Sequence, residues 1–105
     1  MRSLETGFLE KVYENVLVHE LRKAGLIVAQ QHRMAVRYDD VVAGDYTVDL
    51  LVEDLALVEL KVTKAIDDIH CVQCLNYLKA TGLHLCLLLN FGGLRLEIKR
   101  MVQGF

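Results

Sequence analysis

Two apolar runs in the middle of the chain, Tyr46–Val52 and Leu57–Val62, constrain the fold more than any other feature of the sequence. In both runs apolar residues alternate with other types, which is typical of strands because successive side chains point to opposite faces. The turn Glu53-Asp54-Leu55 would join them as an antiparallel hairpin, with Asp49 directly across from Glu59. One face of this predicted hairpin carries the apolar residues Tyr46, Val48, Leu50, Val52, Ala56, Val58, Leu60 and Val62, and the other carries Asp49, Glu59 and Lys61.

The charged residues on that second face have two interpretations. A solvated sheet face with an ion pair is the simpler one, and such a pair contributes little to stability. Carboxylates directly opposed across strands repel, however, and a divalent cation would remove the repulsion. Oxygen ligands of this kind suit Mg²⁺, and Lys61 beside them could orient a water molecule or stabilise charge on a phosphoryl oxygen. The pattern therefore favours a metal site at Asp49 and Glu59.

The segment Gly7–Ala24 has helical periodicity, and Gly25 is a plausible end. Glu10 falls on the same stripe as Leu17 and Leu21, so this helix could aim an acid at the sheet. The alternative is local: with Gly7 as N-cap, Glu10 would occupy N3, where the helix dipole favours acids.

A second helix is predicted over Ile66–Thr81, ending at Gly82. Gln73 and Tyr77 are four residues apart and would share a sheet-facing stripe, on which they could reach a metal-bound water or a nucleic-acid phosphate. More often such residues satisfy backbone groups between helix and sheet. The predicted stripe holds Ile66, Ile69, Gln73, Tyr77 and Ala80, with Cys71, Leu75 and Leu78 opposite.

The remaining strands complete an α/β fold. A strand is expected from Ile27 to Tyr38, a strand buried on both faces over Leu83–Leu89, and a half-exposed final strand over Leu94–Lys99. The order αβββαββ predicts a mixed central sheet flanked by helices. Its second helix would be the crossover that makes the strand at Leu83 parallel to the strand of Glu59.

The composition of the chain limits what it can bind and where it can act. The 105 residues suffice for one domain, and 53% hydrophobic residues with a mean hydropathy of +0.29 suggest self-association as a homodimer. No apolar run is long enough to span a membrane and no signal sequence is apparent, which favours a cytoplasmic protein.

The formal charge of −2 predicts weak, salt-sensitive nucleic-acid binding through local cations such as Arg33, Arg37, Lys64 and Lys79. Three cysteines make no disulfide framework and are expected to be buried thiols.

Several motifs in order resemble a known family. The stretch Gly7-Phe8-Leu9-Glu10-Lys11-Val12-Tyr13 resembles the Gly-x-x-Glu-x-x-Tyr signature of the GxxExxY proteins, which belong to the PD-(D/E)xK nuclease superfamily. Asp49 followed by Glu59-Leu60-Lys61 resembles the split acid and Glu-x-Lys core of that superfamily. Gln73-Cys74-Leu75-Asn76-Tyr77 is similar to the Gln-x-x-x-Tyr motif of its RecB-like branch. The similarity runs from about Gly7 to Arg100.

The resemblance implies a single domain over residues 1–105 with a restriction-endonuclease-like core. It implies that Mg²⁺ or Mn²⁺ is bound by the side chains of Glu10, Asp49 and Glu59 and the carbonyl of Leu60. Lys61 would act on the attacking water, and Gln73 and Tyr77 would support the site or touch the nucleic-acid backbone. Two features depart from the family: Val48 stands where a proline is usual, and relatives usually carry another helix before the glycine.

Three hypotheses follow. The first is a metal-dependent nuclease, acting on DNA, with Asp49, Glu59, Lys61 and Gln73 as its catalytic residues. The second is a weak or inactive nuclease-fold module that serves oligomerisation or protein interaction. The third is a small-molecule phosphatase that would use the same ions.

Overall fold

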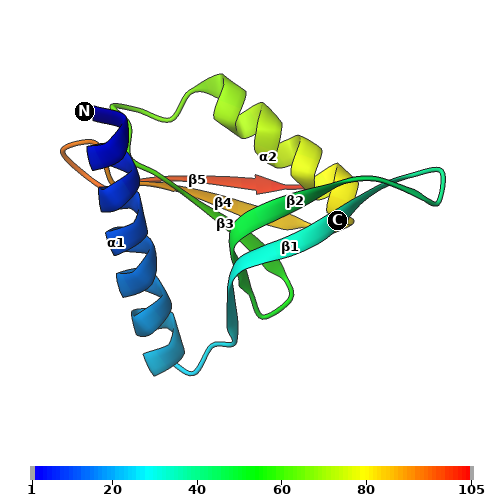
Figure 1. Ribbon diagram of the computed structural model, residues 1–105, viewed down its shortest axis with the longest axis horizontal. Helices are drawn as coiled ribbons and strands as arrows, with labels where there is room; N and C mark the ends of the chain where they lie inside the picture. Colours follow the sequence, from blue (N-terminus) through cyan, green and yellow to red (C-terminus); the bar gives the residue numbers. More distant parts are fainter. Residues whose placement is uncertain (1, 105) are drawn as a thin grey trace.

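A five-stranded sheet lies between two helices in this computed structural model, which describes the backbone of residues 2–104 and the side chains of residues 7–104 (Figure 1). The elements follow the predicted order αβββαββ and form the predicted α/β fold. They are α1 (Arg2–Lys23), β1 (Val28–Tyr38), β2 (Val41–Val52), β3 (Ala56–Lys61), α2 (Asp68–Thr81), β4 (Leu85–Asn90) and β5 (Glu97–Val102). No helix within residues 2–104 is long and apolar enough to cross a membrane.

The strands lie side by side in the order in which they occur along the chain. Neighbouring strands are antiparallel except β3 and β4, which are parallel and joined by α2, as predicted. The predicted register of the β2–β3 hairpin is confirmed near its turn, where Leu50 pairs with Val58 and Val52 with Ala56. The hairpin of β1 and β2 extends well beyond the other strands (Figure 1).

The predicted division of the hairpin into one apolar and one charged face is wrong beyond Leu50. Leu50, Val58 and Leu60 pack toward α1, but Val48 packs with Leu57 and the residues of α2. Val48 and Leu50 are two residues apart and would share a face in a regular strand, so β2 changes faces at Asp49. The neighbouring strand is irregular at the same level, because Gln31 has a φ of +50°, a value uncommon outside glycine.

Both helix starts differ from their predictions. Because α1 begins at Arg2, Gly7 lies inside the helix, and the interpretation of Gly7 as N-cap with Glu10 at N3 is wrong. In α2 the first helical residue is Asp68 rather than Ile66, since Asp67 caps the helix and donates its backbone N–H to His70 Nδ1. The end of α2 at Thr81 agrees with the prediction, and α1 ends at Lys23, one residue before the predicted Ala24. Gly82 adopts a φ of +76° and donates its N–H to the carbonyl of Leu78.

The sheet-facing stripe of α2 is displaced by one residue from the predicted one. Cys74 and Leu78 are fully buried, whereas Gln73 and Ile69 are exposed. Leu78 therefore packs inward, against the prediction, and Tyr77 lies half-buried at the margin of the stripe. Cys74 and Cys86 are buried free thiols, as expected, whereas Cys71 is also free but only half-buried, against the expectation.

The last two strands also differ from expectation. In β4 every second residue is buried, but Leu85, Leu87 and Leu89 are only half-buried, and Leu87 and Leu89 border an apolar hollow that Leu17 and Leu21 of α1 also line. The expected burial of this strand on both faces is thus wrong. The last strand starts at Glu97, and Leu94, predicted to begin it, is fully exposed.

Candidate active site

The two central acids lie where β2 separates from β3, and each bonds to the backbone of the other strand. Asp49 Oδ2 accepts a hydrogen bond from the backbone N–H of Leu60, at 2.9 Å. The carboxylate of Glu59 accepts one from the backbone N–H of Asp49. These side-chain bonds satisfy the backbone donors at the point where the strands diverge. Sequence reasoning correctly placed Asp49 next to Glu59, although not on a regular ladder.

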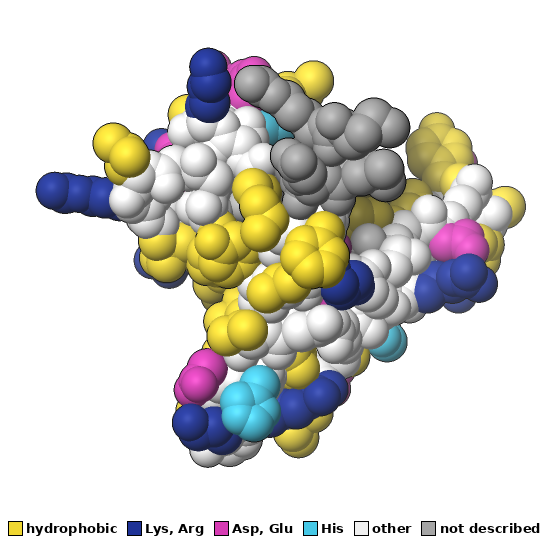
Figure 2. All heavy atoms as spheres, turned by 60° about the vertical axis from the view of Figure 1, so that its left-hand side comes forward, with side chains coloured by type: hydrophobic (Ala, Val, Ile, Leu, Met, Phe, Trp, Pro, Cys, Tyr) yellow, Lys and Arg dark blue, Asp and Glu magenta, His cyan; other side chains and the backbone are white. Residues whose placement is uncertain are grey.

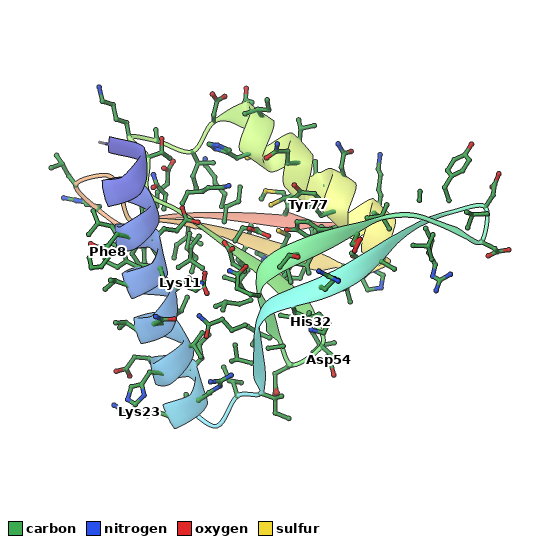
Figure 3. The ribbon with its side chains drawn as sticks, in the orientation of Figure 1. Phe8, Lys11, Lys23, His32, Asp54 and Tyr77 are labelled. Atoms are coloured by element: carbon green, nitrogen blue, oxygen red, sulfur yellow. The ribbon has the colours of Figure 1, made fainter. Side chains whose placement is uncertain are left out.

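A cavity of about 300 Å³ opens between α1 and the first two strands on the Asp49 side. It is lined by Gly7, Glu10, Lys11, Glu14, Gln31 and Asp49. Lys11 points from α1 toward the sheet, whereas Phe8 points away from it (Figure 3). Burial raises the pKa of Glu10, and the nearby charge of Asp49 raises it further. Glu10 and Asp49 therefore make this cavity acidic. Glu10 faces the sheet, as its position on the predicted stripe of α1 implies.

Glu59 faces a smaller hollow of about 30 Å³ beneath α2. Its Oε1 accepts a hydrogen bond from the hydroxyl of Tyr46, whose ring stacks on Tyr77 with centroids 3.8 Å apart. Burial raises the pKa of Glu59 to about 7, against the lowering effect of Lys61. The same hollow is lined by Glu59, Lys61, His70, Gln73, Cys74, Tyr77 and Leu88.

The predicted site residues are thus divided between two adjoining hollows. Lys61 connects them electrostatically, because its charge lowers the pKa of both Glu10 and Glu59. Within residues 7–104, no three acidic, histidine or cysteine side chains are grouped closely enough to hold an ion. Metal ligation by Glu10, Asp49, Glu59 and the Leu60 carbonyl therefore stays a prediction. The donor chemistry fits a hard divalent cation, since the carboxylate and carbonyl groups supply only oxygen ligands. A cation would also offset the cost of charging Glu10 and Glu59, whose pKa values are raised by burial.

Two residues that sequence reasoning missed complete the acidic cavity. Glu14 is only 2% exposed and accepts hydrogen bonds from the side chains of Lys11, Gln30 and Gln31. It lies one helical turn beyond Glu10, so the projection that found Glu10 could also have found it. Gln31 bonds to both Glu14 and Asp49, and no local pattern in the sequence indicates this.

The mixed sheet between two helices defines a restriction-endonuclease-like fold. An alkaline exonuclease (LHK-Exo) from Laribacter hongkongensis is similar in structure, with a TM-score of 0.58 at 14% sequence identity. The similarity covers 90% of this chain and 56% of that one, so this chain corresponds to little more than half of the exonuclease. The sequence model of the PD-(D/E)XK nuclease superfamily matches residues 1–101, and the chain belongs to that superfamily. No curated protein sequence matches it.

Proposed function

We propose that this protein is a Mg²⁺- or Mn²⁺-dependent nuclease that hydrolyses phosphodiester bonds in DNA. The observation that carries the proposal is the reciprocal bonding of Asp49 and Glu59 at the divergence of β2 and β3, with the charge of Lys61 lowering the pKa of Glu59 and of Glu10. Membership of a nuclease superfamily and the fold shared with an exonuclease support it.

In this proposal the cation ligands are Glu10, Asp49, Glu59 and the carbonyl oxygen of Leu60. When bound, a divalent cation supplies a Lewis acid that polarises a phosphoryl oxygen and lowers the pKa of its water. Glu59 must be ionised to act as a ligand, and the neighbouring Lys61 favours that state. Glu10 must also be ionised to act as a ligand. Burial and the charge of Asp49 oppose this, because both raise the pKa of Glu10.

Lys61 acts on the reacting groups. Its ammonium orients the attacking water and stabilises charge on the phosphoryl oxygens as the new oxygen–phosphorus bond forms and the bond to the leaving oxygen breaks. Gln73 and Tyr77 line the hollow that holds Glu59 and Lys61, where they can contact the nucleic-acid backbone. The position of Gln73 and Tyr77 beside Glu59 and Lys61 supports the narrower assignment of this protein to the GxxExxY group within the RecB-like branch.

The test is cleavage of end-labelled single- and double-stranded DNA and RNA with Mg²⁺, with Mn²⁺ and with EDTA. We expect cation-dependent cleavage of DNA and a loss of about 10²–10³ in rate for Lys61→Ala. The matched control is Lys23→Ala, which removes an exposed lysine from the far end of α1 and should cleave at the wild-type rate (Figure 3). Absence of cation-dependent cleavage of any substrate would contradict the proposal, and cleavage of RNA alone would correct its substrate.

A second candidate function is a nuclease-fold module that acts through self-association. The observation that favours it is an exposed apolar stripe on α1, formed by Phe8, Val12 and Val16, which are 69%, 41% and 55% exposed. Apolar side chains gather on this side of the molecule (Figure 2). Calorimetric titration with Mg²⁺ separates the two functions, because this module has no need to bind the cation. Sedimentation at micromolar concentration tests the homodimer.

A further inference from the structure

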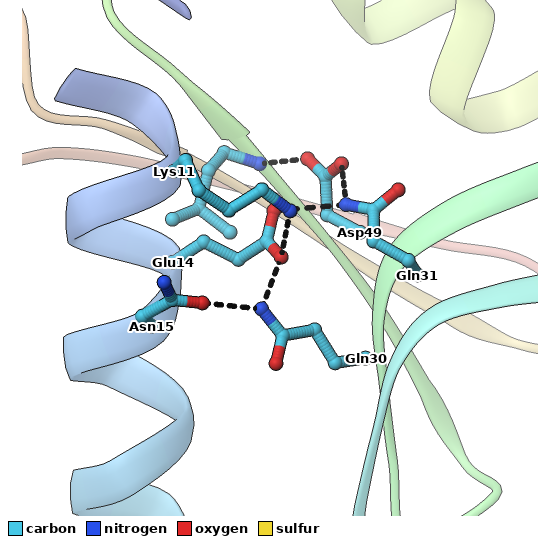
Figure 4. A network of polar contacts seen from close by, with 7 residues as sticks. Lys11, Glu14, Asn15, Gln30, Gln31 and Asp49 are labelled. Carbon is cyan, nitrogen blue, oxygen red and sulfur yellow. Dashed lines mark hydrogen bonds and ion pairs between the residues drawn. The ribbon is translucent and has the colours of Figure 1, made fainter. Parts of the chain in front are cut away.

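A buried carboxylate outside the predicted ligand set organises the cavity beside Asp49 (Figure 4). Glu14 accepts hydrogen bonds from Lys11 Nζ at 3.0 Å and Gln31 Nε2 at 2.9 Å, and a further one from Gln30 Nε2. An ionised carboxylate with almost no exposure is costly unless several donors compensate it. Three donors from two elements do so here, and two of them come from adjacent residues of β1.

The side-chain amides of Gln30 and Gln31 both donate to Glu14, but their second hydrogen bonds go to different residues. Gln31 Nε2 donates to Glu14 Oε1 and also to Asp49 Oδ1, at 3.1 Å. Gln30 Nε2 donates to Glu14 and also to Asn15 Oδ1, at 2.7 Å. Each amide group has two hydrogens, so both bonds can form at once. Gln31 thus connects Glu14 to Asp49, while Gln30 connects Glu14 back to α1.

This connection fixes the orientation of the Asp49 carboxylate. Oδ2 is held by the backbone N–H of Leu60 and Oδ1 by Gln31, so both oxygens have a directional partner. Glu14 determines which end of the Gln31 amide faces the cavity, because an ionised carboxylate only accepts hydrogen bonds and requires the nitrogen. The same nitrogen then meets Asp49. The remaining lone pairs of Asp49 are left for a ligand in the cavity.

We propose that Glu14 and Gln31 are positioning residues that hold the Asp49 carboxylate ready for a divalent cation. The inference rests on the proposed function, since it assigns Asp49 as a ligand. Neither residue touches the reacting groups. Partners of metal-binding carboxylates typically change affinity about 10–100-fold when they are removed. A purely structural role would instead be to attach α1 to β1, and in that role Gln30 and Gln31 are equivalent.

The experiment compares Gln31→Met with Gln30→Met in the full chain. Methionine is similar in length to glutamine and cannot donate. Both variants lose a bond to Glu14, so both should lower the melting temperature by similar amounts. Mn²⁺ titration calorimetry should show at least about tenfold weaker binding for Gln31→Met and a change within about twofold for Gln30→Met. Equal Mn²⁺ affinities in the two variants would overturn the positioning role and leave the proposed function standing.

Glu14→Gln is the second variant, in case Gln31→Met does not fold. It keeps the size of the side chain and one acceptor oxygen but no longer dictates the orientation of the Gln31 amide. Weaker Mn²⁺ binding is expected, and wild-type affinity in this variant would overturn the proposal. If the wild-type protein itself binds no Mn²⁺, the proposed function fails and the positioning role fails with it.

Discussion

The two faces of the sheet are packed differently. On the α2 face, Cys74 and Leu78 are fully buried against Leu57, Cys86 and Leu88. On the α1 face, Val18 is the buried apolar residue of the helix within residues 7–23, and an apolar hollow of about 230 Å³ remains beside it. The hollow is lined by Leu17, Leu21, Leu26, Val52, Ala56, Val58, Leu87 and Leu89.

This difference in packing assigns different roles to the two faces: the α2 face contributes most to the stability of the fold, and the α1 face leaves a cavity accessible to solvent. The α2 face has the close packing of a protein core, whereas the attachment of α1 relies in part on the hydrogen bonds around Glu14. The acidic cavity opens on this less closely packed side, where in the proposed function a substrate would enter. Because β2 changes faces at Asp49, that acid reaches the open side while Glu59 stays beneath α2.

The largest expected effect tests the open face. Asp49→Asn should lower the cleavage rate by about 10²–10³, because the amide keeps an acceptor for the Leu60 N–H but loses the charge that binds the cation. The melting temperature should fall modestly, because the amide nitrogen cannot accept the hydrogen bond from Gln31. Asp45→Asn is the matched control, as Asp45 is an exposed acid of the same strand. Wild-type cleavage by the Asp49 variant would show that the acidic cavity is not the active site.

The packed face should dominate stability. Leu78→Ala empties a fully buried position and is expected to lower the free energy of unfolding by about 2–5 kcal/mol. Leu17→Ala, on a half-buried residue that already borders the hollow, should cost only about 1 kcal/mol. Urea unfolding of both variants measures the difference. Equal losses would mean that the two faces contribute equally and that the contrast in packing has no energetic consequence.

Glu59 makes the packed face sensitive to pH. Its pKa is about 7 in the folded protein against an ordinary 4.5, so the folded state holds the proton more tightly. Between these values the folded state binds more protons than the unfolded state, and stability must fall as pH rises, by at most about 3 kcal/mol. In EDTA, Glu59→Gln should therefore unfold at higher urea than wild type at pH 8, and the difference should shrink toward pH 5. A constant difference would contradict the raised pKa.

Much of this architecture could be predicted from local patterns. The short turn and the alternating runs fix the pairing of Leu50 with Val58, because only that register puts the apolar residues together. The stripe of α2 was misassigned because Gln73 and Tyr77 have the same spacing as Cys74 and Leu78. Periodicity alone does not choose between stripes that differ by one residue.

The site was predictable only in part, for a different reason. Asp49, Glu59 and Lys61 are unusual residues within apolar strands, and their types alone indicate chemistry. The change of face at Asp49 depends on contacts between distant residues, including the hydrogen bond from Gln31. Gln31 also adopts a backbone conformation that its residue type does not favour. Such features arise from tertiary structure and leave no periodic signal.

The smallest expected effect concerns how nucleic acid approaches the proposed site. With a formal charge of −2, the protein should neutralise few phosphates, so the slope of log affinity against log salt should be shallow but not zero. Lys64 follows Lys61 on the loop before α2, and Lys64→Ala should reduce the slope for duplex DNA by about 0.9, the value for one phosphate contact. Lys23→Ala, at the far end of α1, should leave the slope unchanged.

Binding measured with the Asp49→Asn protein avoids cleavage during the titration. A slope of zero would exclude phosphate contacts, and equal changes in the two lysine variants would mean that the approach is not confined to the Lys61 side.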